Sequence, residues 1–230
     1  MTFARPDHIS ALDTLPRMPA WVTSARDETL EDVAFLSGAA LNHLHLVLGH
    51  AEVPQALLRE RLALRAAEAC VGFSGRSERA GDLRDAVHLL RPGDLPGPAG
   101  ETCLAWRRAV ERPVSIKALG RALPILELGQ IATWLDTGKG APVTRAAMAL
   151  EAVLREAPRA DEAALVLADA ALAQALGWTH LVPLIPTGLK RADLRKRGHD
   201  LRLACHRAVT ASAVEAARLA VDLARRASLL

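Results

Sequence analysis

The residues best suited to chemistry flank a loop rich in proline and glycine at positions 91–98. The set consists of Arg84, Asp85, His88, Arg91, Asp94 and Arg107. Two helices that enter and leave one tight loop bring their adjoining ends together. Backbone N–H groups near residues 98–101, where the second helix begins, suit an anion such as a phosphate together with Arg91. The cluster therefore predicts an anion pocket. The alternative is that these side chains only hold a structural turn.

Metal chemistry finds less support in the same region. Asp85 and His88 stand three residues apart, a spacing at which a carboxylate and an imidazole on one helix can reach one metal ion. The sequence holds no second pair of this kind, which a two-metal helical site needs. His43 and His50 are two helical turns apart, too far to share an ion. We therefore predict no metal site and no cofactor.

A second charged feature is the stretch from Gly188 to Arg207, where seven Lys or Arg stand against two Asp, a net charge of +5. The cations predicted to contact a partner are Lys190, Arg191, Arg195, Lys196, Arg197 and Arg202. Such a cluster suits the phosphates of a nucleic acid or an acidic protein surface. The alternative is a solvated loop. Aromatic residues make up only 3% of the chain, which leaves few platforms for stacking single-stranded bases.

The elements that must position these residues are predicted to be helices. Alanine occupies 45 and leucine 38 of the 230 positions. Both lose little side-chain freedom in a helix, while the β-branched and aromatic residues typical of sheets are scarce. A chain of this length buries enough surface to fold without a disulfide or a structural metal. We predict an all-α protein, a single bundle of about seven to nine helices with a long C-terminal helix.

Apolar periodicity and the punctuation by proline and glycine place the helices. The predicted segments are about 24–49, 54–72, 78–90, 99–111, 115–134 with a division at Pro124, 143–156, 161–176 and 200–229. Ser24 stands where a helix cap belongs, with acidic residues following it. Residues 1–23 hold three prolines and no helical period. They are predicted to form an irregular arm, residues 24–230 a single α-helical domain, and residues 178–198 a connector.

The final predicted helix has one polar and one apolar face. Its polar face carries Glu215, Arg218, Asp222 and Arg226, charges that neutralise one another at spacings of three and four. Its apolar face consists of mostly small side chains: Cys205, Val209, Ala216, Ala220 and Leu223. A neighbouring helix can approach such a face closely. A homo-oligomer that acts as a scaffold is also compatible with it.

Cysteine usage and hydropathy predict a cytoplasmic protein. Cys70, Cys103 and Cys205 lie far apart and form no C-x-x-C pair, which indicates a reducing compartment. Residues 1–9 contain no apolar stretch of the kind that a secretory signal needs. The most apolar window, residues 163–178, is interrupted by Asp169 and Gln174 and is too short to span a bilayer. No membrane partner is predicted.

Three runs of residues resemble a known family. They are the run from Leu83 to Gly100 with its prolines and glycines, the run Ala105-Trp-Arg-Arg, and Leu176-Gly-Trp followed by Pro183-Leu. In these runs the chain resembles a mainly alphaproteobacterial family known as domain of unknown function 1403. The similarity covers most of the chain, from about Leu36 to its end. It implies no activity, substrate, cofactor or catalytic residue.

Three hypotheses on function remain open. The favoured one is a non-enzymatic binding or regulatory protein whose cationic connector meets nucleic acid or an acidic protein. The second is an enzyme or ligand-binding protein with an anion pocket in the region from Arg84 to Arg107. The third is a helical oligomeric scaffold. No catalytic residue is predicted, because the chain has no G-x-S-x-G elbow or comparable nucleophile motif.

Overall fold

Helices form the regular structure of residues 17–24 and 29–229, the part of the chain that the computed structural model describes. They are α1 (Trp21–Ser24), α2 (Leu30–Leu48), α3 (Gln55–Phe73), α4 (Ala80–His88), α5 (Gly97–Glu111), α6 (Ile116–Ala122), α7 (Leu128–Asp136), α8 (Pro142–Glu156), α9 (Asp161–Ala175), α10 (Ile185–Gly188), the 3-10 helix η2 (Arg191–Arg195) and α11 (Gly198–Ala227). Within these ranges the β-structure is one isolated bridge, between Pro113 and His180. The prediction of an all-α fold with a long C-terminal helix is confirmed, since α11 has 30 residues.

Proline, glycine and serine bound several helices as the sequence predicts. Ser115 Oγ accepts a hydrogen bond from the Ala118 N–H (3.2 Å) at the start of α6, and Pro124 lies between α6 and α7. Gly177 follows α9 with a φ of 68°. Its left-handed backbone lets the Trp178 N–H donate to the Ala173 carbonyl (2.9 Å), a Schellman arrangement. The chain therefore leaves α9 in a fixed direction.

The start of α2 differs from the prediction, because Ser24 is not its cap. Ser24 ends α1, where its hydroxyl donates to the Ala20 carbonyl (3.0 Å). Thr29 caps α2 instead. Its Oγ1 accepts from the Asp32 N–H (3.2 Å) while Asp32 Oδ2 accepts from the Thr29 N–H (2.9 Å), a reciprocal capping box. Residues 21–23 of the predicted arm are thus helical. Residues 1–16 lie outside the described part of the chain, so the arm stays a prediction there.

The segment predicted to be a connector, residues 178–198, contributes its apolar side chains to the core. Leu181, Leu184 and Ile185 are fully buried. Gly188 lies so close to α11 that a Cβ at this position would overlap the backbone of Ala208. This part of the connector is therefore packed, whereas Lys190, Arg191 and Arg195 beyond it are exposed, as the alternative of a solvated loop expects. Prolines interrupt the helical period here, which is why the sequence pattern does not reveal the buried positions.

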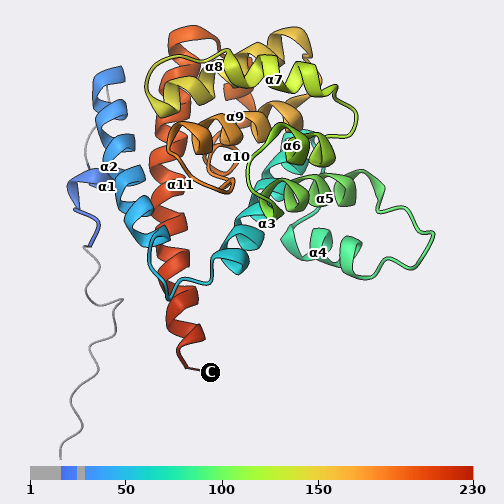
Figure 1. Ribbon diagram of the computed structural model, residues 1–230. Coiled ribbons are helices and arrows are strands. Elements are labelled where there is room, and N and C mark those ends of the chain that lie inside the picture. Colours follow the sequence, from blue (N-terminus) through green and yellow to red (C-terminus); the bar gives the residue numbers. More distant parts are fainter. Residues whose placement is uncertain (1–16, 25–28, 230) are drawn as a thin grey trace, which may run out of the picture.

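Helix α9 lies inside the fold (Figure 1), with α8, α7, α10 and α5 against it. All residues from Ala163 to Ala173 are buried. A helix that is apolar around its whole circumference must be covered on every side, so the other helices are layered around it. Its 15 residues reach about 22 Å, whereas the hydrocarbon core of a bilayer is roughly 30 Å thick. Across the described ranges, no helix combines the length and the apolarity needed to cross a membrane.

Helix α11 runs the full height of the molecule, with α2 beside it (Figure 1). The two predicted faces of α11 are confirmed: its small apolar side chains are buried, and Glu215 forms an exposed ion pair with Arg218 (2.7 Å). Helices α3, α4 and α5 pack on one another to form a separate side of the molecule. This side carries Arg84, Asp85, His88 and Arg107, four of the residues predicted to form an anion pocket.

Candidate functional site

A cavity of about 260 Å³ lies between α3, α4 and α5 and is called here the α3–α4–α5 cavity. Its lining residues are Leu57, Glu60, Arg61, Ala63, Leu64, Arg84, Val87, His88, Cys103 and Arg107. The α3 positions 57, 60, 61 and 64 recur at three- and four-residue spacing, so one face of α3 forms a wall. Residues Cys103 and Arg107 of α5 are likewise one turn apart. Three helices thus surround one hollow.

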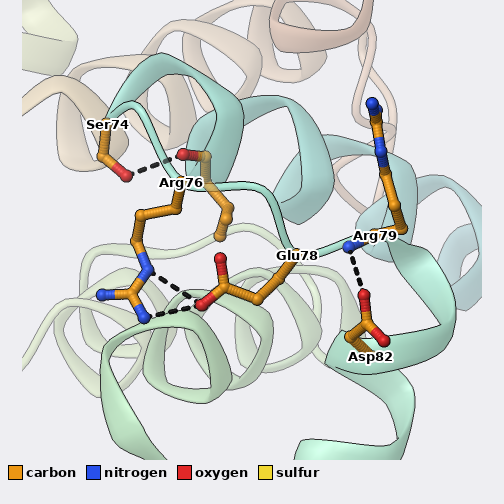
Figure 2. A network of polar contacts seen from close by, with 6 residues as sticks. Ser74, Arg76, Glu78, Arg79 and Asp82 are labelled. Atoms are coloured by element: carbon orange, nitrogen blue, oxygen red, sulfur yellow. Dashed lines mark hydrogen bonds and ion pairs between the residues drawn. The ribbon is translucent and has the colours of Figure 1, made fainter.

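Helix α4 is held in the fold by one apolar residue and a polar turn. Leu83, the one buried residue of α4, is fully enclosed. Figure 2 shows the turn: Arg76 pairs with Glu78 (2.6 Å), and the Asp82 carboxylate accepts from the Arg79 N–H (2.8 Å) at the start of α4. The Arg79 guanidinium also reaches Glu68 on α3 (3.6 Å). These contacts set the position of α4, and with it one wall of the cavity.

The structure brings three of the six predicted anion-site residues together. Arg84, His88 and Arg107 all line the α3–α4–α5 cavity. Asp85 does not line it, but its Oδ1 accepts from the Arg84 guanidinium (2.9 Å) at the surface. An exposed pair of this kind stabilises the fold little. Arg84 therefore remains available to a ligand at small cost.

Arg91 and Asp94 lie outside this cavity. Asp94 Oδ2 accepts from the Arg91 N–H (3.0 Å), and the Asp94 N–H donates to the Arg91 carbonyl (3.0 Å). The two residues thus close a tight turn between α4 and α5, and both side chains are exposed. For this pair the structural alternative fits the geometry better than a role in anion binding.

The α3 wall of the cavity was not anticipated from the sequence. Arg61 and Glu60 bring further charges, while Leu57 and Leu64 are apolar. The periodicity of α3 gives these positions a common face. No local signal says which helix that face meets, because α3 and α5 are separated by α4 and two loops. Only the folded chain shows that Arg61 faces the same hollow as Arg84.

The cavity combines a positive net charge with several apolar lining residues. Three guanidinium groups stand against the single carboxylate of Glu60. Leu64, Val87 and Cys103 are apolar or nearly so. Burial raises the pKa of the Cys103 thiol, and the charge of Arg107 opposes this effect only in part. Cys103 is therefore a poor nucleophile at neutral pH and acts as a small apolar side chain.

Asp85 and His88 are not arranged around a shared metal position. Asp85 is engaged with Arg84, and His88 lines the cavity. Over the residues for which placement is described, no group of three or more His, Cys, Asp or Glu is arranged to hold a metal ion.

The predicted cationic connector is partly tied to its own backbone. Lys196 Nζ pairs with Asp193 (2.7 Å), and Arg197 Nη1 donates to the Leu194 and Lys196 carbonyls (2.8 and 2.7 Å). Lys190, Arg191 and Arg195 are exposed on and beside η2, whereas Arg202 is half-buried on α11. Only some of the six cations therefore have side chains that are both exposed and without an internal hydrogen bond or ion pair to the described residues.

A buried carboxylate, Asp169 on α9, fixes the chain between α9 and α10. It is 1% exposed, and its two oxygens accept from the Leu184 N–H (3.2 Å) and the Ile185 N–H (3.1 Å). Burial raises the pKa of Asp169 to about 8, although these hydrogen bonds act in the opposite direction. The sequence shows Asp169 only as a polar interruption of an apolar window.

A second buried polar contact joins α2 to α11. Ser37 Oγ and His206 Nδ1 are 2.7 Å apart, and the Ser37 hydroxyl also lies 3.0 Å from the Ala34 carbonyl. Burial, together with the charge of Arg202, lowers the pKa of His206 to about 4. His206 is therefore neutral at pH 7, as a histidine buried between two helices has to be.

Fold and site together define an all-α protein with a cationic cavity between three helices. The chain belongs to the family described as Protein of unknown function (DUF1403), whose model matches residues 6–230. The resemblance carried by residues 83–100 is thereby confirmed. No curated protein and no solved structure matches the chain.

Asp169 makes the stability of the protein depend on pH. Its pKa is raised in the folded state, so its contribution to stability is fully present below about pH 4 and is lost as the pH rises through about 8. We expect this contribution, measured as the difference in free energy of unfolding between the wild type and Asp169→Asn, to fall over this window by at most about 1.4 kcal/mol per pH unit. His206, whose pKa is lowered, acts in the opposite direction below about pH 6.5 in both proteins. Denaturant titrations of the wild type and of Asp169→Asn, between pH 5 and 8, measure the effect.

Asp169→Asn should remove the contribution of Asp169, because the amide does not titrate, and should leave the opposite slope that His206 gives below about pH 6.5. It should also lower stability at pH 5 by about 1 to 3 kcal/mol, because the buried NH2 group places two donors where the protonated carboxyl of Asp169 has one. Asp222→Asn, an exposed change on α11, serves as the control and should keep the wild-type slope. A wild-type slope that persists in Asp169→Asn would contradict this account.

Proposed function

We propose that the protein binds a small anionic molecule in the α3–α4–α5 cavity and acts as a binding protein, not an enzyme. The observation that carries this proposal is the convergence of Arg61, Arg84 and Arg107, from three different helices, on one hollow. Guanidinium groups bind carboxylate and phosphate through paired N–H donors. With Glu60 as the single carboxylate, the lining carries a net charge of +2 when His88 is neutral.

The shape and lining of the cavity suggest a compact ligand with an apolar part. Its volume of about 260 Å³ lies just below the roughly 300 to 1,000 Å³ that is usual for ligand pockets. Leu57, Leu64 and Val87 provide apolar contact area, and the guanidinium groups provide the charged contacts. A small carboxylic acid or phosphate ester meets both conditions.

Binding is favoured over catalysis by the residues available. Cys103 is the one thiol that lines the cavity, and its raised pKa keeps it protonated at neutral pH. His88 is exposed, and among residues 17–24 and 29–229 no carboxylate hydrogen-bonds to its ring, as a catalytic triad would need. The lining therefore suits recognition of charge and shape.

A second candidate is the binding of nucleic acid by the cationic segment, which the sequence favoured. The exposure of Lys190, Arg191 and Arg195 supports it, while the internal contacts of Lys196 and Arg197 reduce the free charge. Binding to phosphates releases counterions, so affinity for mixed-sequence duplex DNA should fall steeply between low and physiological salt. Absent binding at low salt, or binding that ignores salt, would remove this candidate.

The three cysteines also bear on location. Cys70, Cys103 and Cys205 are all free and buried. Thiols persist in reducing compartments. This supports the cytoplasm as the place where the protein works.

The pocket proposal is tested with benzoate and its neutral counterpart benzamide as probes. Calorimetric titration should show that benzoate binds more tightly than benzamide, because only benzoate offers a carboxylate to Arg84 and Arg107. Arg84→Gln and Arg107→Gln should each weaken benzoate binding about tenfold or more, the loss of one charge-assisted hydrogen bond.

Arg91→Gln is the matched control. It removes the same charge from the same loop region but lies outside the cavity, so benzoate affinity should stay at the wild-type value. Equal effects of Arg84→Gln and Arg91→Gln, or equal binding of benzoate and benzamide, would reject the proposal. Thermal melts of each variant separate lost binding from lost folding.

A further inference from the structure

A second hollow, of about 560 Å³, borders the C-terminal end of α2, the start of α3 and the segment that follows α9. Its polar lining consists of His45, Gln55, Arg59, Trp178, Thr179 and His180. No residue of the lining carries a carboxylate, in contrast to Glu60 in the α3–α4–α5 cavity. The only formal charge in this lining is therefore the positive charge of Arg59.

The walls of this hollow are held in place by backbone contacts. The Thr179 carbonyl accepts from the Val114 N–H (2.9 Å), next to the isolated bridge between Pro113 and His180. Arg59 Nε donates to the Val110 carbonyl (3.2 Å). Both contacts tie the lining to the end of α5. The site is thus preorganised, which lowers the entropy lost when a ligand binds.

The contact between His45 and Trp178 determines which ring nitrogen of His45 can donate a hydrogen bond. The Trp178 indole N–H lies 2.9 Å from His45 Nδ1, and an indole nitrogen can only donate. Nδ1 of His45 is therefore unprotonated, and the neutral ring carries its proton on Nε2. Trp178 reaches His45 because Gly177, with its positive φ, turns the chain at the end of α9. Trp178 acts here as a positioning residue.

Arg59 and His180 add further donors to the lining. The Nε of Arg59 is used by Val110, which leaves its two terminal nitrogens for a ligand. Burial, together with the charge of Arg59, lowers the pKa of His180. His180 is therefore neutral at pH 7 and can donate through one ring nitrogen.

We infer that this hollow is a second binding site, which takes the oxyanion group, phosphate or carboxylate, of a small molecule. Arg59 supplies the charged contact and His45 Nε2–H the oriented neutral donor. The absence of a carboxylate from the lining favours an anion over a cation. The inference stands on residues that the α3–α4–α5 cavity does not use.

The test is a titration of the full chain with inorganic phosphate, followed by tryptophan emission, because Trp178 lines the hollow. A saturable change is expected in the wild type and should vanish in Trp178→Phe, which removes both the reporting indole and the hydrogen bond that orients His45. Arg59→Gln should raise the apparent dissociation constant about tenfold or more. His45→Ala, at an exposed position, should weaken binding in the same direction without disturbing the fold.

Arg112→Gln is the matched control, since Arg112 lies beside the bridge at Pro113 but does not line the hollow. It should bind phosphate as the wild type does. Acetate in place of phosphate distinguishes a carboxylate site from a phosphate site, and saturation with either supports the inference. No saturable change with either anion at millimolar concentration would overturn it, as would equal weakening by Arg59→Gln and Arg112→Gln. Failure of benzoate to bind the other cavity would leave this signal unchanged.

Discussion

The burial of α9 on every side is the constraint on which the rest of the structure depends. Residues Ala163 to Ala173 have no solvent-facing position, so the surrounding helices must cover the whole circumference of α9. Alanine makes this possible, because small side chains let backbones approach closely. The one carboxylate in this stretch, Asp169, is satisfied by the backbone N–H groups that begin α10. The central helix thereby also fixes the path of the chain that leaves it.

Both candidate sites lie at the periphery of the helices that surround α9. Helices α3, α4 and α5 stand on one side of the core, and α4 has one buried residue in it, Leu83, with Val87 packed against it in part. The rest of α4 is therefore free to present Arg84 and His88 to a cavity. The second site depends on α9 more directly, because the turn at Gly177 carries Trp178 to His45. In both places a rigid core holds polar groups that contribute little to the core itself.

Local features of the fold could be predicted from the sequence, whereas long-range pairings could not. Alanine and leucine periodicity gives the helices, and Pro124 and Gly177 mark where they end. The convergence of Arg84, His88 and Arg107 follows from their position around one loop.

Arg61 could not be assigned to this site, because no local sequence signal indicates that α3 faces α5. The contact between His45 and Trp178 spans 133 positions, and no spacing rule reaches so far. A serine followed by acidic residues predicts a helix cap at Ser24, but the reciprocal pair of Thr29 and Asp32 satisfies more of the helix end and caps α2 instead.

Native-state hydrogen exchange tests most directly whether α9 is the centre on which the fold depends. Amides of a helix enclosed on all sides exchange only when the whole protein unfolds, whereas a peripheral helix opens locally at lower free energy. The account predicts that the amides of Ala164 to Ala173 exchange with the free energy of global unfolding and that those of α4 exchange well before them. Exchange of α9 at the same low free energy as α4 would contradict it.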